Sequence, residues 1–250
     1  MMKKNLGAIV LAAGKGTRMK SDLAKVLHPI CGKPMLTYPL NVAMAVGSER
    51  TVVIIGHQAS LVRETFKDEG LTFVEQREQL GTGHAVLQAQ ESFSGYDGTI
   101  LILCGDVPLL RPSTVRTLFA YHISEKAVVT ILTAIRDNSS GYGYGRIVKG
   151  ERGEVLRIVE ERDATEEERK IKEINSGIYC VESKFLFAAV AEIGRKNSQK
   201  EYYLTDIIKI ARRKGYPVRS FTVTDSDEVM GINTPDDLKQ ADRLKRMSYQ

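Results

Sequence analysis

The fold is decided at residues 6–19 by the sequence LGAIVLAAGKGTRM. Its first half, Leu6–Ala12, is an unbroken apolar run of the length of a buried strand, and its second half is a short loop with glycines and basic residues. A buried strand that passes directly into a glycine-bearing loop is typical of a parallel sheet. Glycines let backbone N–H groups approach phosphate oxygens, and Arg18 together with Lys25 can neutralise the charge. The stretch therefore predicts a phosphate-binding loop at the end of a central strand.

Spacing excludes two other glycine-rich loops. A dinucleotide-binding loop ends in Gly or Ala in the pattern G-x-G-x-x-G, but Met19 stands at that position and would obstruct close packing of the helix on the strand. A Walker loop needs G-x-x-x-x-G-K-[ST], which the stretch does not contain. A tight turn without a ligand is the remaining alternative, and it gives the two basic residues Arg18 and Lys25 no purpose.

Short apolar runs recur through the first half of the chain, at Thr51–Ile55, Thr99–Cys104 and Ala127–Thr133. Helix-compatible segments such as Pro34–Ala45 and Thr82–Gln90 lie between them. This alternation predicts an α/β fold with a doubly wound, mainly parallel sheet.

The pattern changes to shorter pieces at about residues 137–181, where we expect a small antiparallel insertion. A glycine-tyrosine run at residues 141–145 precedes an expected strand at Arg146–Val148, and a second strand is expected at Val155–Glu160. The charged run Asp163–Lys172 predicts an exposed helix or a lid. Regular elements are then expected at Ile174–Val181, Lys184–Ile193, Asp206–Arg213 and Val218–Val223. A C-terminal helix is expected at residues 234–250, with Thr234 as its N-cap and Pro235 in its first turn.

Composition limits the function classes. The chain has 250 residues and a formal net charge of +5, which suits anionic substrates, nucleic acid or solvated helix faces. Its basic clusters lack interleaved aromatic residues, so we expect no nucleic-acid binding. Cys31, Cys104 and Cys180 are too widely spaced to indicate a disulfide framework or a zinc site. No apolar run approaches the roughly 20 residues that span a bilayer, and we expect a cytoplasmic protein without membrane contact.

Six segments, taken together, resemble a known family. Residues 11–18 with 25–27 are similar to the signature of the sugar-nucleotide pyrophosphorylases. The others are QREQLGTGHA at 76–85, GDVPL at 105–109, GYGRI at 143–147, EINSG at 173–177 and EYYLTD at 201–206. In this order they resemble the uridyltransferase domain of the bacterial N-acetylglucosamine-1-phosphate uridyltransferases, from about Leu6 to Asn233.

The resemblance implies a Rossmann-like nucleotidyltransferase domain at residues 1–233 that makes UDP-N-acetylglucosamine and pyrophosphate from UTP and N-acetylglucosamine 1-phosphate, with Mg²⁺, for the cell envelope and its peptidoglycan. Another pair of nucleoside triphosphate and sugar 1-phosphate, such as dTTP and glucose 1-phosphate, is an alternative. So is a nucleotide-sugar sensor without turnover, although Arg18, Lys25, Asp106 and Asn233 are retained. Family members usually add a left-handed β-helix that acetylates glucosamine 1-phosphate. No hexapeptide repeat occurs in this sequence, so we expect it to contain no acetyltransferase half. A stand-alone transferase and a piece of a longer protein are both compatible with this expectation.

The resemblance also assigns residues to the nucleotide. Gln76 and the turn at Gly81 would read the uracil edge, because an amide and backbone groups can match its donors and acceptors; a plain surface position is the alternative for Gln76. The expected nucleotide-binding set is Leu11, Ala12, Ala13, Gly14, Gly16, Thr17, Gln76, Gln79, Gly81, Thr82, Cys104 and Gly105. His84 has no second histidine at metal-ligand spacing and is expected to be packed or capping.

Arg18, Lys25 and Asp106 are the expected catalytic residues. Asp106 follows the apolar run Thr99–Cys104, so its carboxylate should lie at the carboxyl end of a strand, where ligands bind in open α/β sheets. Mg²⁺ prefers oxygen ligands. The expected metal ligands are Asp106 and, by resemblance, Asn233, for which helix capping is the alternative.

By the same resemblance, the expected sugar-binding residues are Gly145, Glu160, Asn175, Tyr203 and Thr205. Glu160 can accept from sugar hydroxyls, and Asn175 can both donate and accept. A solvent-facing position is the alternative for Glu160, which begins an acidic segment.

Overall fold

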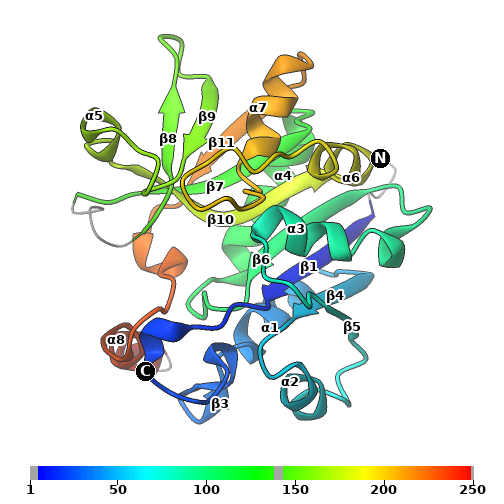
Figure 1. The fold of residues 1–250 in the computed structure, drawn as a ribbon, viewed down its shortest axis with the longest axis vertical. Helices are drawn as coiled ribbons and strands as arrows, with labels where there is room; N and C mark the ends of the chain where they lie inside the picture. The colour runs from blue at the N-terminus through cyan, green and yellow to red at the C-terminus, as the bar shows by residue number, and fades with distance from the viewer. Residues whose placement is uncertain (1–4, 138–142, 249–250) are drawn as a thin grey trace.

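One mixed sheet forms the centre of the computed structural model, which describes residues 5–137 and 143–248 (Figure 1). The strand order is β11-β7-β10-β6-β1-β4-β5. These strands are β1 (Leu6–Ala12), β4 (Arg50–Ile55), β5 (Thr72–Glu75), β6 (Thr99–Cys104), β7 (Val129–Ile135), β10 (Glu173–Glu182) and β11 (Val218–Thr222). The helices are α1 (Thr37–Ala45), α2 (Ala59–Thr65), α3 (Thr82–Gln88), α4 (Pro112–Ser124), α5 (Glu166–Arg169), α6 (Ser183–Val190), α7 (Asp206–Arg213) and α8 (Pro235–Met247).

Four of the six pairings along this strand order are parallel, which confirms the predicted fold class. Strand β1 pairs with β4 and β6, β4 with β5, and β7 with β11, all in parallel. Only apolar strands can be buried on both faces in this way. Strand β10 departs from the pattern, because it runs antiparallel to both β6 and β7.

Helices cover both faces of the sheet, as a doubly wound fold requires. Alternate residues of a strand point to opposite faces. Val10 and Leu101 join a core with side chains of α1, α2 and α4, whereas Ile9 and Ile100 join one with side chains of α3, α6 and α7. The carboxyl ends of β1 and β6 lie side by side, and the loop after β6 meets β1 there, where Gly105 donates to Leu11.

The antiparallel hairpin of β8 (Arg146–Lys149) and β9 (Val155–Val159) projects from the β10 side of the sheet. It joins β10 through the pair Arg146 and Ile174. The pairing of β10 with β7 shifts between Asn175 and Tyr179, so the strand bulges where Asn175 turns toward the hairpin. Of the predicted glycine-tyrosine run, residues 141–142 lie outside the described residues.

One local prediction differs from the structure for a clear reason. The expected helix at residues 34–45 begins only at Thr37, because Lys33–Pro34 (β3) pairs with Pro29–Ile30 (β2). Helix α8 starts as expected: Thr234 forms a capping box with Asp237.

Among residues 5–137 and 143–248, no helix has the length and apolar character needed to cross a membrane.

Candidate active site

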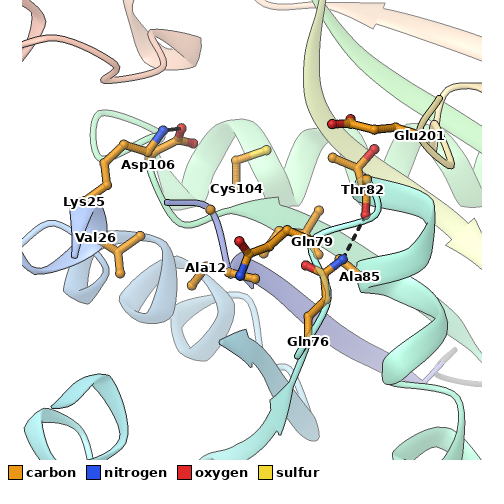
Figure 2. Close-up of a pocket in the computed structure, with 14 residues that line it drawn as sticks. Ala12, Lys25, Val26, Gln76, Gln79, Thr82, Ala85, Cys104, Asp106 and Glu201 are labelled. Atoms are coloured by element: carbon orange, nitrogen blue, oxygen red, sulfur yellow. Dashed lines mark hydrogen bonds and ion pairs between the residues drawn. The ribbon is translucent and has the colours of Figure 1, made fainter. Parts of the chain in front are cut away.

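A cavity of about 280 Å³ lies at the carboxyl ends of β1 and β6, beside the N-terminus of α3. Figure 2 shows Gln76, Gln79 and Thr82 on one side of it and Lys25 and Asp106 on the other. Its lining residues are Leu11, Ala12, Ala13, Gly14, Lys25, Val26, Gln76, Gln79, Gly81, Thr82, Ala85, Cys104, Asp106 and Glu201. Nine of the twelve residues expected to bind the nucleotide therefore share one cavity.

A second cavity of about 240 Å³ adjoins the first. The two share the wall formed by Leu11, Thr82, Cys104 and Asp106. The remaining lining includes Arg18, Gly145, Glu160, Asn175, Thr205 and Asn233, which come from the sugar, phosphate and metal sets expected from the sequence. The two cavities are thus the halves of one cleft, joined at Asp106.

Three expected nucleotide residues line neither cavity. Gly16 has φ +62°, and a Cβ at this position would lie 2.6 Å from the Cβ of Lys25. Gly105 donates its backbone N–H to the carbonyl of Leu11 at 2.9 Å. Thr17 is exposed at the start of a short 3₁₀ helix. Gly16 and Gly105 therefore shape the backbone around Lys25 and Leu11 instead of facing the cavities.

Gln76 is 3% exposed, unlike a plain surface residue, and its side chain is held at several points. Its Nε2 donates to the Gly81 carbonyl at 3.1 Å and lies 3.0 Å from His84 Nδ1. Its backbone N–H donates to Ile55 at the end of β4, at 2.8 Å. Figure 2 shows the amide oxygen of Gln76 directed toward the cavity.

Lys25, Asp106 and Asn233 meet where the two cavities join. The Lys25 ammonium forms an ion pair with Asp106 and donates to Asn233 Oδ1 at 3.1 Å. Asn233 Nδ2 donates to Gly231 at 3.3 Å, which leaves its oxygen for Lys25. The two oxygen atoms expected to hold a metal therefore converge on one cation.

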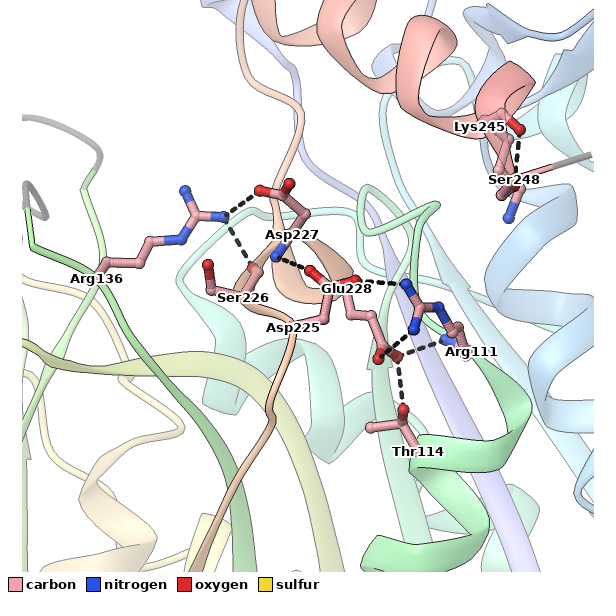
Figure 3. A network of polar contacts seen from close by, with 9 residues as sticks. All are labelled: Arg111, Thr114, Arg136, Asp225, Ser226, Asp227, Glu228, Lys245 and Ser248. Atoms are coloured by element: carbon pink, nitrogen blue, oxygen red, sulfur yellow. Dashed lines mark hydrogen bonds and ion pairs between the residues drawn. The ribbon is translucent and has the colours of Figure 1, made fainter. Parts of the chain in front are cut away.

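The segment that leads to Asn233 is anchored by the network of polar contacts shown in Figure 3. Glu228 accepts from the Thr114 hydroxyl at 2.6 Å and from the backbone N–H of Arg111 at 3.0 Å. The Arg111 guanidinium also pairs with Asp225. This network ties the 3₁₀ helix Ser226–Val229 to α4 and so fixes the approach to Asn233.

Four of the five expected sugar residues lie in the second cavity. Thr205 donates to Glu160 at 3.0 Å, and Asn175 Oδ1 accepts from the Tyr179 hydroxyl at 2.9 Å. Glu160 lines the cavity and does not face the outer surface, and burial there raises the pKa of its carboxyl against the opposing hydrogen bond from Thr205. Tyr203 lines neither cavity: it is 7% exposed, and its hydroxyl accepts from Gln199 at 2.9 Å.

Glu201 and Tyr144 line the cleft, although the sequence reasoning gave them no role. Both belong to segments that carried the family resemblance, and that membership was the available signal. The Tyr144 hydroxyl accepts from the backbone N–H of Gly231 at 3.0 Å. Burial raises the pKa of the Cys104 thiol to about 12, so Cys104 is a neutral wall residue and a poor nucleophile.

Two segments of the cleft are joined by backbone hydrogen bonds. Gly83 donates to Tyr202 at 2.7 Å, and Tyr202 donates to Leu80 at 2.8 Å. The next turn adds a bond from the Leu204 N–H to the Thr82 hydroxyl, at 3.0 Å. The turn at residues 80–83 beside the first cavity is thereby tied to the segment at residues 201–205, which reaches the second.

A model of the family described as nucleotidyl transferase matches residues 7–239. The bifunctional protein GlmU of Geotalea daltonii is 53% identical over 243 residues, which span 97% of this chain and 53% of that protein. The GlmU protein of Clostridioides difficile is 47% identical over 242 residues, which span 97% and 52%. The chain thus spans about half the length of the curated relatives it matches.

Solved structures show a similar fold. A UDP-glucose pyrophosphorylase complexed with UDP-glucose superposes with a TM-score of 0.76 at 19% identity, covering 98% of this chain and all of that one. The apo form of a UDP-glucose pyrophosphorylase gives 0.75 at 18% identity.

Proposed function

The chain belongs to the nucleotidyl transferase family, and we propose that it transfers a uridylyl group from UTP to N-acetylglucosamine 1-phosphate, releasing UDP-N-acetylglucosamine and pyrophosphate. The cleft carries this proposal. Its first half suits a nucleoside triphosphate, its second half suits a sugar phosphate, and Lys25 and Asp106 lie at the junction. About 50% identity to GlmU proteins over nearly the whole chain supports the choice of this reaction within the family.

In this reaction an oxygen of the sugar phosphate attacks the α-phosphorus of UTP. A new P–O bond forms, the bond to the β-phosphate oxygen breaks, and pyrophosphate leaves with the electron pair. The nucleophile is already an anion, so no general base and no covalent enzyme intermediate are needed. The task of the protein is to align two anions that repel one another, and Lys25 and Arg18 are the cations placed to do so.

A magnesium ion fits the donor set. Asp106 and Asn233 supply a carboxylate and an amide oxygen, and the ammonium of Lys25 lies between them, where a cation is therefore favourable. Among the described residues no group of three or more His, Cys, Asp or Glu side chains could hold a metal, so phosphate oxygens and water would complete the coordination. When bound, Mg²⁺ would neutralise phosphate charge. We place the reaction in the cytoplasm, at the start of cell-envelope precursor synthesis.

The experiment that tests the proposal is pyrophosphate release across a matrix of nucleoside triphosphates and sugar 1-phosphates. We expect UTP to be strongly preferred over CTP and dTTP. Gln76→Ala should reduce this preference, because the base edge then loses a buried partner. Turnover of dTTP equal to that of UTP would contradict the assignment, and turnover of no pair would favour a sensor.

The sugar arm of the same matrix tests the second cavity. N-acetylglucosamine 1-phosphate should exceed glucosamine 1-phosphate in kcat/KM, because Gly145, Glu160 and Asn175 can read the amide that only the former carries. Asn175→Ala should narrow the difference. Comparable efficiency for both sugars in the unaltered protein would refute this assignment of the second cavity.

A further inference from the structure

The side-chain amide of Gln76 has two ends, and only one of them can face a base. Both hydrogens of its Nε2 have acceptors: one is the Gly81 carbonyl at 3.1 Å and the other is His84 Nδ1 at 3.0 Å. Within the described part of the chain no donor reaches its Oε1, which points into the first cavity (Figure 2). The site therefore presents a fixed acceptor.

His84 and the Gly81 carbonyl together set which end of the amide faces the cavity. The carbonyl can only accept, so it fixes the NH₂ end of Gln76 on this side, where His84 Nδ1 is placed to accept the second hydrogen. The Gln88 Nε2 lies 3.1 Å from the other ring nitrogen, Nε2, and donates to the His84 carbonyl at 3.2 Å. The ring is held by its place in α3 and by the Tyr202 ring, whose centroid is 6.1 Å away. Without the Nδ1 acceptor, the Gln76 amide would lose one of the two contacts that set its direction.

We propose that His84 is a positioning residue that sets pyrimidine specificity by holding the Gln76 oxygen toward the base. Uracil offers a donor at N3, which pairs with this oxygen, whereas cytosine offers a lone pair at N3, which the oxygen repels. An amide turned by 180° would reverse that preference. The inference rests on the proposed function for the identity of the nucleotide, but the geometry concerns the base alone.

The test compares His84→Leu, which removes the acceptor, with His84→Asn, whose Oδ1 takes the place of Nδ1. In kcat/KM for pyrophosphate release, we expect His84→Leu to lower the preference for UTP over CTP by about 10-fold. The lower preference should come from a change in the ratio of the KM values for UTP and CTP. The kcat at saturating UTP should stay within about 3-fold of that of the unaltered protein. His84→Asn should restore the preference to within about 3-fold.

Gln88→Leu is the matched control, because it removes the other partner of the ring and leaves Nδ1 in place; the preference should stay unchanged. If His84→Leu does not fold, His84→Ala carries the same expectation. A folded leucine or alanine variant with the original preference would overturn the inference. The inference would also be overturned if kcat/KM fell by the same factor for UTP and CTP in both the asparagine and the leucine variant, because a residue with a merely structural role would give that result.

Binding of UDP and CDP, measured by calorimetry without any sugar, separates this inference from the proposed function. Suppose that the protein binds UDP more tightly than CDP, that this preference changes among the His84 variants as expected, and that no sugar phosphate is turned over. The inference then holds and the proposed reaction fails. If the unaltered protein makes UDP-N-acetylglucosamine but the His84 variants keep their UDP preference, the reaction stands and the positioning role is refuted.

Discussion

Asp106→Asn is expected to lower turnover by at least about 10²-fold, the scale of one major electrostatic stabiliser. The carboxylate lies at the junction of the two cavities, where the charges of both substrates meet. It also pairs with Lys25, so its loss disturbs the only charge pair at that junction among the described residues. Asn233→Ala should cost less, because a water molecule can replace one neutral ligand.

Turnover at saturating substrates and varied Mg²⁺ measures this effect. Both pockets remain in Asp106→Asn, so calorimetry should still detect UDP-N-acetylglucosamine binding, which shows that the variant is folded. Near-normal turnover of that variant at limiting Mg²⁺ would make Asp106 a structural residue at a strand end and remove the proposed metal site.

Lys25→Met is expected to lower kcat/KM by about 10²-fold, since it removes a preorganised cation from the point where phosphate charges are brought together. The Lys25 side chain is 12% exposed, so little solvent is present to screen its charge. Lys33→Met is the matched control, because Lys33 is an exposed lysine of β3 outside both cavities, and its activity should be unchanged.

A second measurement on Lys25→Met should move in the opposite direction. In the free protein the ammonium of Lys25 occupies the oxygens of Asp106 and Asn233 that we assign to the metal. Removing it should therefore strengthen the binding of Mn²⁺ alone, as followed by electron paramagnetic resonance. A folded variant that keeps both its kcat/KM and its metal affinity would contradict the role given to Lys25.

The parallel centre of the fold could be predicted because strands such as β1 and β6 are buried on both faces and are therefore mostly apolar. The direction of β10 could not. The apolar run Ile174–Val181 reads the same for a parallel and an antiparallel neighbour, and its pairing with β6 and β7 depends on the path of the preceding hairpin. The short strand β5 and helix α2 were not predicted either, since their burial is partial and gives a weak pattern.

The candidate site was predictable where its residues follow strands, because strand ends meet at one edge of a parallel sheet. Asp106 after β6 and Gly14 after β1 are such cases. Contacts between distant segments could be expected only through the resemblance, which assigned Lys25 and Asn233 to one site; their direct hydrogen bond, across 208 positions of the chain, could not be predicted. Tyr203 shows the limit of resemblance alone, since its neighbours Glu201 and Thr205 line the cleft while Tyr203 itself packs away from it.

We expect the hydrogen bonds between residues 80–83 and 201–205 to link ligand binding in the two halves of the cleft. A ligand that orders the turn at Gly81 also orders Tyr202, and the same segment continues to Thr205 and its bond to Glu160. The ligand that binds first then bears the conformational entropy cost of ordering that segment, so the second ligand binds with a smaller entropy cost. Such heterotropic cooperativity is reciprocal, so a uridine nucleotide and a sugar phosphate should each increase the affinity of the protein for the other by the same factor.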